Sequence, residues 1–457
     1  MEKTGCAVVG GGPAGMMLGL LLARAGVQVT VLEKHADFLR DFRGDTVHPS
    51  TIRLIDELGL GQEFRQLPQS RLKNVAFPVP GGPPVTMGDF SALPPPYNYV
   101  AMMPQWDFLN FLAAAAAEEP GFTLLMSHTA TGLVRNGGRV RGVRFRTADG
   151  TADELPADLV IATDGRHSVL RTAAGLASKE FSVPFDTWWF KLPRHASETG
   201  EVAGLVPAFG PGAALLALFR TDYYQMGYLA AKGTDVRIRA EGVEGFRRRV
   251  AALRPDLADR VDAIRSLDDL HWLDVRLNRL HRWYINGMLC IGDAAHAMSP
   301  AGGVGINLAI QDAVAAAELL APPLLRGNVT TADLEKVERR RRLPTVVVQS
   351  VQRLMQRAIF VPIMTGKRST FPAAALFVGR RVPAVRKIIP RFIAFGPRPE
   401  HAPAFARRAP QHPQMPAAPT GANPEPGKPP EGYFGPAPHA AARRHSHHGR
   451  WGSRSAS

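Results

Sequence analysis

The sequence predicts an α/β protein in which a parallel sheet carries an inserted, mostly antiparallel β domain and a disordered C-terminal tail. Strand and helix patterns alternate over residues 1–60, which favours the parallel sheet. Short apolar runs separated by polar turns over about 181–275 favour the antiparallel sheet. Beyond about Gly396 the chain is rich in Pro, Ala, His and Arg, a composition typical of disorder.

The expected elements follow from apolar periodicity and from Gly and Pro punctuation. The parallel part should hold strands at Cys6–Val9, Val27–Leu32, Phe122–Met126, Val140–Arg146, Leu159–Thr163 and Met288–Ile291, with helices at Pro13–Ala25, Pro49–Leu58, Trp106–Glu119 and Gly305–Leu320. The inserted part should hold strands at Thr187–Phe190 and Ala213–Phe219 and a charged helix at Val243–Leu253.

Composition excludes several classes of protein. With 457 residues, 45% of them hydrophobic, the chain can bury a large core. Only Cys6 and Cys290 occur, and the N-terminus shows no signal-peptide pattern, so we expect a cytoplasmic protein with reduced thiols. The longest apolar stretch, Met16 to Ala25, is too short to span a bilayer.

The net charge of +15 raises the possibility of an anionic partner. The basic residues do not form one recognisable nucleic-acid module, so we expect no nucleic-acid partner. The basic-apolar stretch from Arg380 to Arg391 leaves weak contact with a membrane surface open. Anionic substrates and cofactor phosphates explain the charge more simply.

The first motif, Gly10-Gly11-Gly12-Pro13-Ala14-Gly15, is a G-x-G-x-x-G between a strand and a helix. Gly10 permits the tight turn, Gly12 lets the backbone approach a pyrophosphate, and Gly15 lets the helix pack on the strand. Glu33 follows about twenty residues on, where an acidic side chain bonds a ribose 2′-hydroxyl. The pattern predicts a Rossmann-type site for FAD or NAD; the alternative is a glycine-rich turn without a ligand.

Two further segments each follow an apolar strand. In the second motif Asp164-Gly165 is typical of an ordinary turn, but Ser168 and Arg171 at fixed offsets make it more specific. The third runs from Gly292-Asp293 through Pro300 to a helix that begins near Gly305. The amides at that helix N-terminus favour a negatively charged ligand.

Together the three motifs resemble the class A FAD-dependent monooxygenases, the family of para-hydroxybenzoate hydroxylase and the polyketide aromatic hydroxylases. The similarity extends from about residue 5 to about 400, with the motifs in the family's order and approximate spacing. It implies a discontinuous FAD-binding domain (1–72, 104–180 and 276–345), a substrate-binding β domain (73–103 and 181–275), a C-terminal helical segment (346–396) and a disordered basic tail rich in Pro and His (397–457).

The resemblance also implies roles for single residues. The pyrophosphate turn would comprise Gly10, Gly12, Pro13, Ala14 and Gly15, with Glu33 and Lys34 at the adenosine ribose. Asp164 would support the pyrophosphate side, Gln105 would lie along the ribityl and phosphate groups, and the amide of Ala130 would meet adenine. Gly292 and Asp293 would hold the ribityl chain, and the amides of Gly303, Gly305, Ile306 and Asn307 would lie against the pyrimidine edge of the flavin.

Two residues are implied in catalysis. Arg43 matches an arginine that touches FAD and guides the reductant, although Arg43-Gly44-Asp45 is also a cell-adhesion tripeptide. The missing secretion signal favours the flavin interpretation. Pro300 resembles a proline that shapes the flavin site. His48 either contacts flavin or substrate or has a structural place at a helix start, and His296 is either an acid–base group or a brace of its loop.

The implied activity is that of a single-component hydroxylase. NAD(P)H reduces FAD, O2 adds at flavin C4a, and the hydroperoxide transfers one oxygen to an aromatic or polyketide-like small molecule. Candidate walls of the substrate pocket are Trp188, Trp189, Phe190, Tyr223, Tyr224 and Met226, which can equally be core residues.

Three alternatives remain at this stage. A FAD-dependent reductase or halogenase of the same fold would insert no oxygen, but the adjacent pair Trp188-Trp189 departs from the halogenase pattern. A non-enzymatic flavin module would be tethered by its basic tail. The histidines at 445, 447 and 448 can bind metal, but without Cys or carboxylate spacing we expect no metal site. The oligomeric state stays open.

Overall fold

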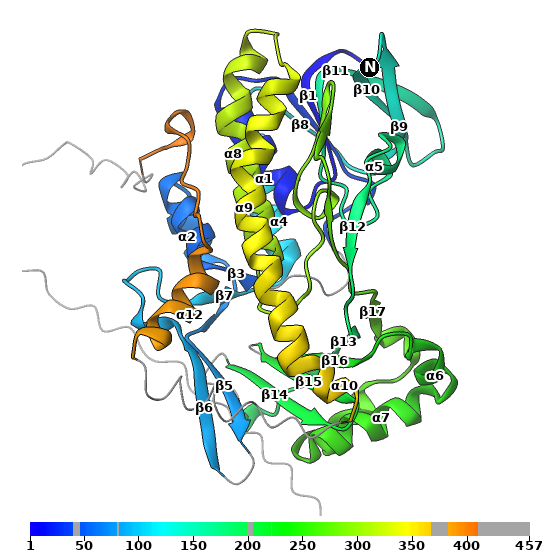
Figure 1. Cartoon of the computed structure of the whole chain (residues 1–457), viewed down its shortest axis with the longest axis vertical. Coiled ribbons are helices and arrows are strands. Elements are labelled where there is room, and N and C mark those ends of the chain that lie inside the picture. Colours follow the sequence, from blue (N-terminus) through cyan, green and yellow to red (C-terminus); the bar gives the residue numbers. More distant parts are fainter. Residues whose placement is uncertain (40–45, 80–81, 199–203, 221, 367–382, 410–457) are drawn as a thin grey trace, which may run out of the picture. The chain divides into compact units, whose positions relative to one another are not determined.

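The computed structural model describes residues 1–39, 46–79, 82–198, 204–220, 222–366 and 383–409. Residues 1–411 form one compact unit, which contains two large sheets and the helices that cover them (Figure 1).

An eight-stranded sheet carries the predicted parallel part of the fold (Figure 1). Its order is β19-β20-β11-β1-β2-β8, and the β9–β10 hairpin continues antiparallel from β11. The strands β8, β2, β1, β11 and β20 run parallel, as predicted. The eight strands are β1 (Thr4–Val9), β2 (Val29–Leu32), β8 (Phe122–Leu125), β9 (Thr129–Asn136), β10 (Arg139–Arg146), β11 (Ala152–Ala162), β19 (Tyr284–Ile285) and β20 (Met288–Cys290).

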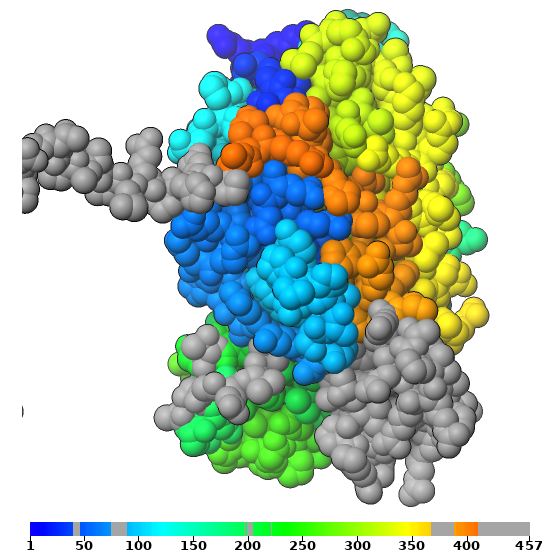
Figure 2. Space-filling model, turned by 90° about the vertical axis from the view of Figure 1, so that its left-hand side faces the viewer, coloured from blue at the N-terminus to red at the C-terminus, as the bar shows by residue number. Residues whose placement is uncertain are grey.

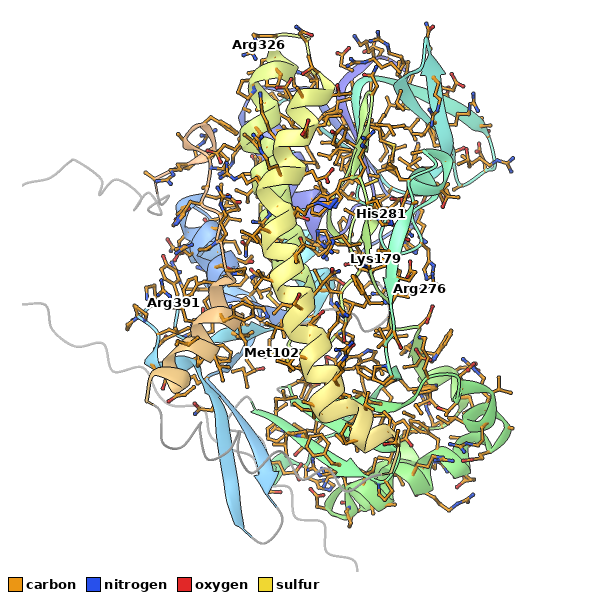
Figure 3. All side chains as sticks on the ribbon, in the orientation of Figure 1. Met102, Lys179, Arg276, His281, Arg326 and Arg391 are labelled. Carbon is orange, nitrogen blue, oxygen red and sulfur yellow. The ribbon has the colours of Figure 1, made fainter. Side chains whose placement is uncertain are left out.

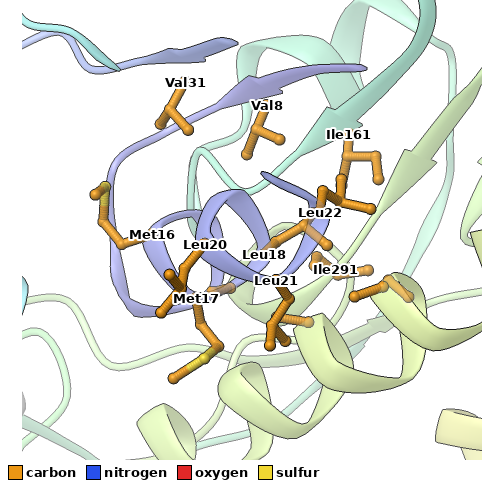
Figure 4. Packing of buried hydrophobic residues seen from close by; sticks show 14 of the residues in the cluster. Val8, Met16, Met17, Leu18, Leu20, Leu21, Leu22, Val31, Ile161 and Ile291 are labelled. Atoms are coloured by element: carbon orange, nitrogen blue, oxygen red, sulfur yellow. The ribbon is translucent and has the colours of Figure 1, made fainter. Parts of the chain in front are cut away.

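Apolar helices bury one face of this sheet. Helix α1 (Pro13–Arg24) packs against α8 (Gly305–Leu325) and α4 (Gln105–Ala117). Figure 4 shows leucine and methionine side chains of α1 packed among residues of β1, β2 and β11. Because the central strands are covered on both sides, their sequences are continuous apolar runs without alternation.

A seven-stranded sheet forms the second layer, in the order β17-β13-β16-β15-β14-β5-β6. All its pairs are antiparallel except β14 with β5, so the mostly antiparallel sheet is confirmed. Its strands are β5 (Asn74–Val79), β6 (Gly82–Asp89), β13 (Phe185–Pro193), β14 (Gly204–Gly210), β15 (Ala213–Phe219), β16 (Tyr223–Ala231) and β17 (His271–Leu273).

Shorter elements connect the two sheets. Two small sheets pair β12 (Ser178–Phe181) with β18 (Leu277–Leu280), and β7 (Val100–Met102) with both β3 (Thr46–Val47) and β4 (Ser70–Leu72). The remaining helices include α2 (Pro49–Glu57), α3 (Gly61–Gln66), α5 (Val169–Ala173), α6 (Asp235–Ala240), α7 (Gly242–Leu253), α9 (Thr331–Met355), α10 (Val361–Met364) and α12 (Pro383–Phe395). A π-helical turn, η6 (Gln356–Phe360), joins α9 to α10.

Among the described residues, α8 is the single helix long and apolar enough to cross a membrane. Of its most apolar window, 78% is buried inside the structure. It packs against α1 and α9, so this length and composition are those of a core helix.

Basic side chains are spread over the unit. The labelled residues Lys179, Arg276, Arg326 and Arg391 belong to four separate segments of the chain (Figure 3). Many other arginines are paired with carboxylates, as Arg249 is with Glu241 and Arg254 with Asp256.

The predicted start of the disordered tail at residue 397 is wrong, because residues 397–409 are ordered. Glu400 is 4% exposed and pairs with Arg340 and Arg341, and Ala402 and Ala406 are buried. In Figure 2 the orange C-terminal segment, residues 383–409, lies between the blue N-terminal part of the chain and the yellow helices. The average composition of the segment gave no sign that one acidic residue and a few small apolar residues in it contact distant parts of the chain. Residues 410–457, the rest of the predicted tail, lie outside the described residues.

Candidate active site

Parallel strand order brings the three motifs to one edge of the first sheet. β20, β11, β1 and β2 are neighbours, and the segments beginning at Gly292, Asp164, Gly10 and Glu33 follow directly at their carboxyl ends. Ligands of open α/β sheets bind at this edge. The motifs are far apart in the sequence, and the sheet alone makes them adjacent.

The glycine turn between β1 and α1 has three different steric constraints. Gly10 has φ +108°, and a Cβ there would lie 2.6 Å from the carbonyl oxygen of Thr163. A Cβ on Gly15 would lie 1.9 Å from the carbonyl oxygen of Gly10. A Cβ on Gly12 would meet no protein atom within 4 Å. Gly10 and Gly15 are therefore required by protein packing, whereas Gly12 opens a cradle.

The N-terminus of α1 adds hydrogen-bond donors to this cradle. Gly12 is the N-cap, Pro13 is the first helical residue, and no side chain caps the helix. Ala14 is 6% exposed and belongs to the core. Uncapped amides and the positive end of the helix dipole favour an anion at this position.

Glu33 closes the far side of the turn. Its carboxylate accepts a hydrogen bond of 2.8 Å from the amide of Gly11 and lies 2.6 Å from Nδ1 of His35. The residue is 2% exposed, whereas Lys34 is exposed. Glu33 thus braces the glycine turn, and a carboxylate still has lone pairs for a further donor.

The Asp164 motif is held by its own helix cap. Ser168 accepts a hydrogen bond from the amide of Arg171 and caps α5. Asp164 accepts at Oδ2 from the amide of Leu170. Its other oxygen, Oδ1, is buried and has no hydrogen-bond partner within the described ranges of the chain. Burial raises the pKa of Asp164, against the hydrogen bond from Ser168. An orphaned carboxylate oxygen at this edge fits a ligand that donates a hydrogen bond.

Arginines join the second motif to the third. Arg171 donates to the carbonyl oxygen of Ala294 at 3.2 Å. Arg166 lies 3.5 Å from Asp293, whose side chain is 32% exposed. Asp293 follows Gly292, which has φ +58°. The turn therefore leaves Asp293 half-buried at the edge of the first sheet, beside Arg166.

His296 lies in a buried ionic network beneath the third motif. Its Nε2 is 2.6 Å from Oδ2 of Asp312, and Oδ1 of Asp312 pairs at 2.9 Å with Arg341, which also pairs with Glu400. Burial alone would raise the pKa of Asp312, but His296 and Arg341 outweigh it and lower the pKa. Asp312 also accepts from the amide of Gly292. This geometry supports the bracing role of His296.

The loop that contains Pro300 is held by two glutamines of α9. Gln352 donates to the carbonyl oxygens of Ser299 and Ala301 at 2.8 and 2.9 Å. Gln349 donates to the carbonyl oxygen of Asn278 at 2.7 Å and also reaches Ala297. Pro300 itself is half-buried. A rigid helix therefore fixes the backbone on both sides of Pro300.

His48 bridges this loop to the C-terminal segment. Its ring nitrogens lie 3.0 Å from the carbonyl oxygens of Gly303 and Ile393. Burial lowers the pKa of His48 to about 4, although both carbonyls favour the proton. Thr46 also donates to Gly303 at 3.0 Å. His48 thus lies between the loop at Gly303 and α12.

The first turn of α8 has no side-chain cap, so its amides are available. Gly305 and Ile306 are half-buried. Asn307 accepts from Ser50 and Thr51 of α2 at 2.5 and 2.8 Å, which ties α8 to α2.

For the remaining predicted residues, the structure gives only the element and the burial, or no description. Gln105 begins α4 and Ala130 lies in β9, and both are half-buried. Arg43 lies outside the described residues, as do Gly44 and Asp45.

The candidate substrate walls separate onto two faces of the second sheet. Trp188, Phe190, Tyr224 and Met226 belong to a core cluster with Phe246 of α7. Trp189 lies on the opposite face, paired with Gly227, and a Cβ on Gly227 would lie 2.9 Å from its ring. Tyr223, four residues before Gly227, shares that face by strand alternation. Trp189 and Tyr223 therefore lie on the sheet face opposite the cluster that contains Trp188.

The row of residues that contains Trp189 lies between two contact zones. On one side, Leu229 and Ala214 pack in a cluster with Met298 and Leu308. On the other side, Leu205 and Leu218 pack in a cluster with Met102 and Ala394. Strand pairing aligns Trp189, Gly227, Leu216 and Pro207 between these zones. The row therefore lies on the face of the second sheet that these two clusters share.

Several residues of the site were missed in the sequence, namely Asp312, Arg341, Gln349, Gln352 and Glu400. Two signals were present. Asp312 is an acid in an otherwise apolar helix, and Gln349 and Gln352 have the spacing of one helix face. Nothing in the sequence pointed to Glu400, because its partners lie far away along the chain.

Comparison with known proteins agrees with this geometry. The model of the FAD binding domain family matches residues 3–353. A 6-methylpretetramide 4-monooxygenase of Streptomyces rimosus is 36% identical over 401 residues, which cover 86% of this chain and 92% of that protein. A para-nitrophenol 4-monooxygenase of a Pseudomonas species is 27% identical, covering 74% of this chain and 83% of its own.

Solved structures show the same fold. A p-nitrophenol 4-monooxygenase of Pseudomonas putida superposes with a TM-score of 0.70 at 23% identity, covering 87% of this chain and all of that one. An anhydrotetracycline hydroxylase of Streptomyces rimosus has a TM-score of 0.68 at 22% identity, covering 86% and 76%.

The chain belongs to the FAD binding domain family, within which it is a class A FAD-dependent monooxygenase. Its cofactor is FAD, and the electron donor of such enzymes is NAD(P)H.

Proposed function

We propose that the enzyme hydroxylates a fused-ring aromatic polyketide, and that the edge of the first sheet holds its FAD. The single observation that supports the substrate class is the similarity to 6-methylpretetramide 4-monooxygenase, which is 36% identical to this chain and is matched over 92% of its length. The half-buried Trp189 on the inner face of the second sheet supports a flat aromatic ligand.

The residues present fit FAD on grounds that belong to this chain. The cradle at Gly12 and the uncapped start of α1 suit a pyrophosphate. The orphaned Oδ1 of Asp164 and the half-buried carboxylate of Asp293 suit hydroxyl donors. The uncapped start of α8 suits the electron-rich edge of a flavin ring. Glu33 would accept from the adenosine ribose while it braces the turn, and Arg43 keeps its proposed contact with FAD.

Bound FAD supplies the redox chemistry, in which NAD(P)H and O2 yield one oxygen atom in the product and one in water. The chain's own residues position the reactants and exclude water. The α9 glutamines hold the Pro300 loop, and Trp189 gives the substrate a flat surface on the second sheet. The preorganised amides of α8 require no rearrangement during the reaction.

We further propose that the division into lobes follows the two large sheets, with residues 73–103 and 181–275 on the substrate side. A cytoplasmic place fits the two thiols, Cys6 and Cys290, which are free and fully buried. Burial raises the pKa of both thiols, so they stay protonated.

The test is turnover of 6-methylpretetramide by the purified, FAD-loaded enzyme. With NADPH and ¹⁸O2, the product should gain one labelled oxygen atom, and the substrate should accelerate NADPH oxidation. A reduced or halogenated product without labelled oxygen would exclude hydroxylation. Anhydrotetracycline is the control for specificity within fused-ring polyketides.

A further inference from the structure

Three glutamines lie at the spacing of one helix face where α9 runs into η6. Gln349, Gln352 and Gln356 are 1%, 2% and 3% exposed. Intervals of three and four residues place side chains on the same face of a helix. A buried row of amides must find hydrogen-bond partners, because an unpaired buried donor costs free energy.

The first two glutamines have such partners. Gln349 and Gln352 donate to backbone carbonyls of residues 278, 297, 299 and 301, as described above. Gln352 also accepts from the amide of Ser299 at 3.3 Å. Gln349 also accepts from Arg279 at 3.0 Å, so both side chains have partners on the Pro300 loop or on β18.

The third glutamine has none. Nε2 of Gln356 is buried and lacks a hydrogen-bond partner in the part of the chain that the structure describes. Gln356 begins η6, a π-helical turn. Such turns are rare and occur frequently at functional sites. Two independent features therefore mark the same residue.

A second orphaned group lies on the strand that packs against this turn. Phe360 of η6 contacts Phe185 of β13 with ring centroids 4.8 Å apart. Thr187 lies two residues from Phe185 on the same face of β13. It is 1% exposed, and its Oγ1 has no hydrogen-bond partner among the described residues. Gln356 precedes Phe360 by one turn. The Phe185–Phe360 contact therefore links the strand that carries Thr187 to the turn that begins at Gln356.

We propose that Gln356 and Thr187 form a polar anchor for an oxygen atom of the substrate, a ring carbonyl or phenolic hydroxyl. This inference rests on the proposed function, because it takes the aromatic polyketide as ligand. Thr187 is followed two residues on by Trp189, so the anchor adjoins the flat wall of the same site. A few polar groups in an apolar pocket fix the orientation of a ligand, which here selects the ring position that reacts.

The thermal stability of the substrate-free protein tests whether the side-chain amide of Gln356 lacks a partner until a ligand binds. Replacing Gln356 by Leu removes an unsatisfied donor at nearly constant volume, so the melting temperature should rise by about 1–3 °C. The matched control is Gln352→Leu, which breaks bonds to two carbonyls and should lower the melting temperature by about 2–5 °C. A fall for Gln356→Leu would show that a structural water or the fold itself uses the amide, and would overturn the proposal.

Ligand binding tests the anchor directly. With 6-methylpretetramide as probe, followed by the change in flavin absorbance, Gln356→Leu and Thr187→Val should each raise the dissociation constant about 3- to 10-fold. FAD content should match wild type. Binding that is intact in wild type and equally tight in both variants overturns the anchor alone. A wild-type protein that holds FAD but does not bind the probe instead contradicts the proposed substrate.

Discussion

At the scale of single residues, the glycines of the first motif have two different steric environments. Gly10 and Gly15 are crowded by neighbouring backbone, whereas Gly12 faces open space. Gly12 has φ −76°, a value that any residue adopts. We therefore propose that glycine is needed at this position to admit a ligand, because the packing of the described residues does not require it.

Gly12→Ala should leave the melting temperature of the FAD-free protein unchanged and weaken FAD binding by about tenfold or more, since the methyl group enters the cradle. Gly15→Ala should destabilise the FAD-free protein itself, because its Cβ would lie 1.9 Å from a carbonyl oxygen. Thermal melts and FAD titration by fluorescence quenching measure the two effects. Unaltered FAD affinity in Gly12→Ala would place the pyrophosphate elsewhere.

His48 makes stability depend on pH. Its pKa is about 4 in the folded protein and about 6.5 when unfolded. Between these values only the unfolded chain takes up a proton, so stability falls as the pH drops from about 6.5 to about 4 and is unaffected by this group above 6.5. The loss is about 3 kcal/mol.

Urea unfolding between pH 7 and pH 4 measures this effect. His48→Gln should flatten the pH dependence by the stated amount, whatever its effect on stability at pH 7. His281→Gln, at an exposed position, is the control. An unchanged slope in His48→Gln would mean that the buried ring is already protonated in the folded state.

At the scale of elements, α9 supports the site along a buried polar stripe. Arg341 binds Asp312 under the third motif, and Gln349 and Gln352 hold the loop beyond it. The outer face of α9 is exposed and charged, with Glu335, Lys336 and Arg339. The buried polar stripe instead replaces the water that the loop carbonyls would otherwise bind.

Arg341→Met should destabilise the protein by about 3–5 kcal/mol, because Asp312 and Glu400 would keep buried charges without their shared partner. The neighbouring Arg342 offers a matched control, since its side chain is 36% exposed and pairs with Glu338. Arg342→Met should cost less than about 1 kcal/mol. Chemical denaturation measures both, and similar losses for the two variants would refute a special role for the buried network.

At the scale of the whole molecule, the segment after α12 joins distant parts of the chain. Glu400 pairs with α9, His401 lies 2.6 Å from Glu57 of α2, and Arg24 of α1 donates to Ala406 at 3.0 Å. These contacts bind the C-terminal segment to three helices around the first sheet. The segment is therefore part of the folded unit.

Truncation after Gln411 should leave the melting temperature unchanged, whereas truncation after Gly396 should lower it by several degrees. The longer deletion removes Glu400 and leaves Arg341 with one buried partner. Differential scanning calorimetry distinguishes the two proteins. Equal melting temperatures would show that residues 397–409 add no stability.

The sequence by itself determined the sheet class and most of its elements, because these depend on local patterns. The Gly10–Gly15 turn, the strand ending at Glu33 and the helix from Gly305 are all read from neighbours within a few residues. The same locality explains the error at residue 397. The composition of a segment cannot show that Glu400 pairs with Arg341, a buried residue that lies far away along the chain.

Tertiary structure decided what these segments do for one another. Only the strand order brings Gly12, Asp164 and Asp293 to one edge of the first sheet. Only the packing of the second sheet decides that Trp188 joins the cluster with Phe246 while Trp189 lies on the opposite face. Pairings of this kind join residues separated by a hundred or more positions. Local propensity carries no information about them, since the free energy that selects them comes from burial after the chain has closed on itself.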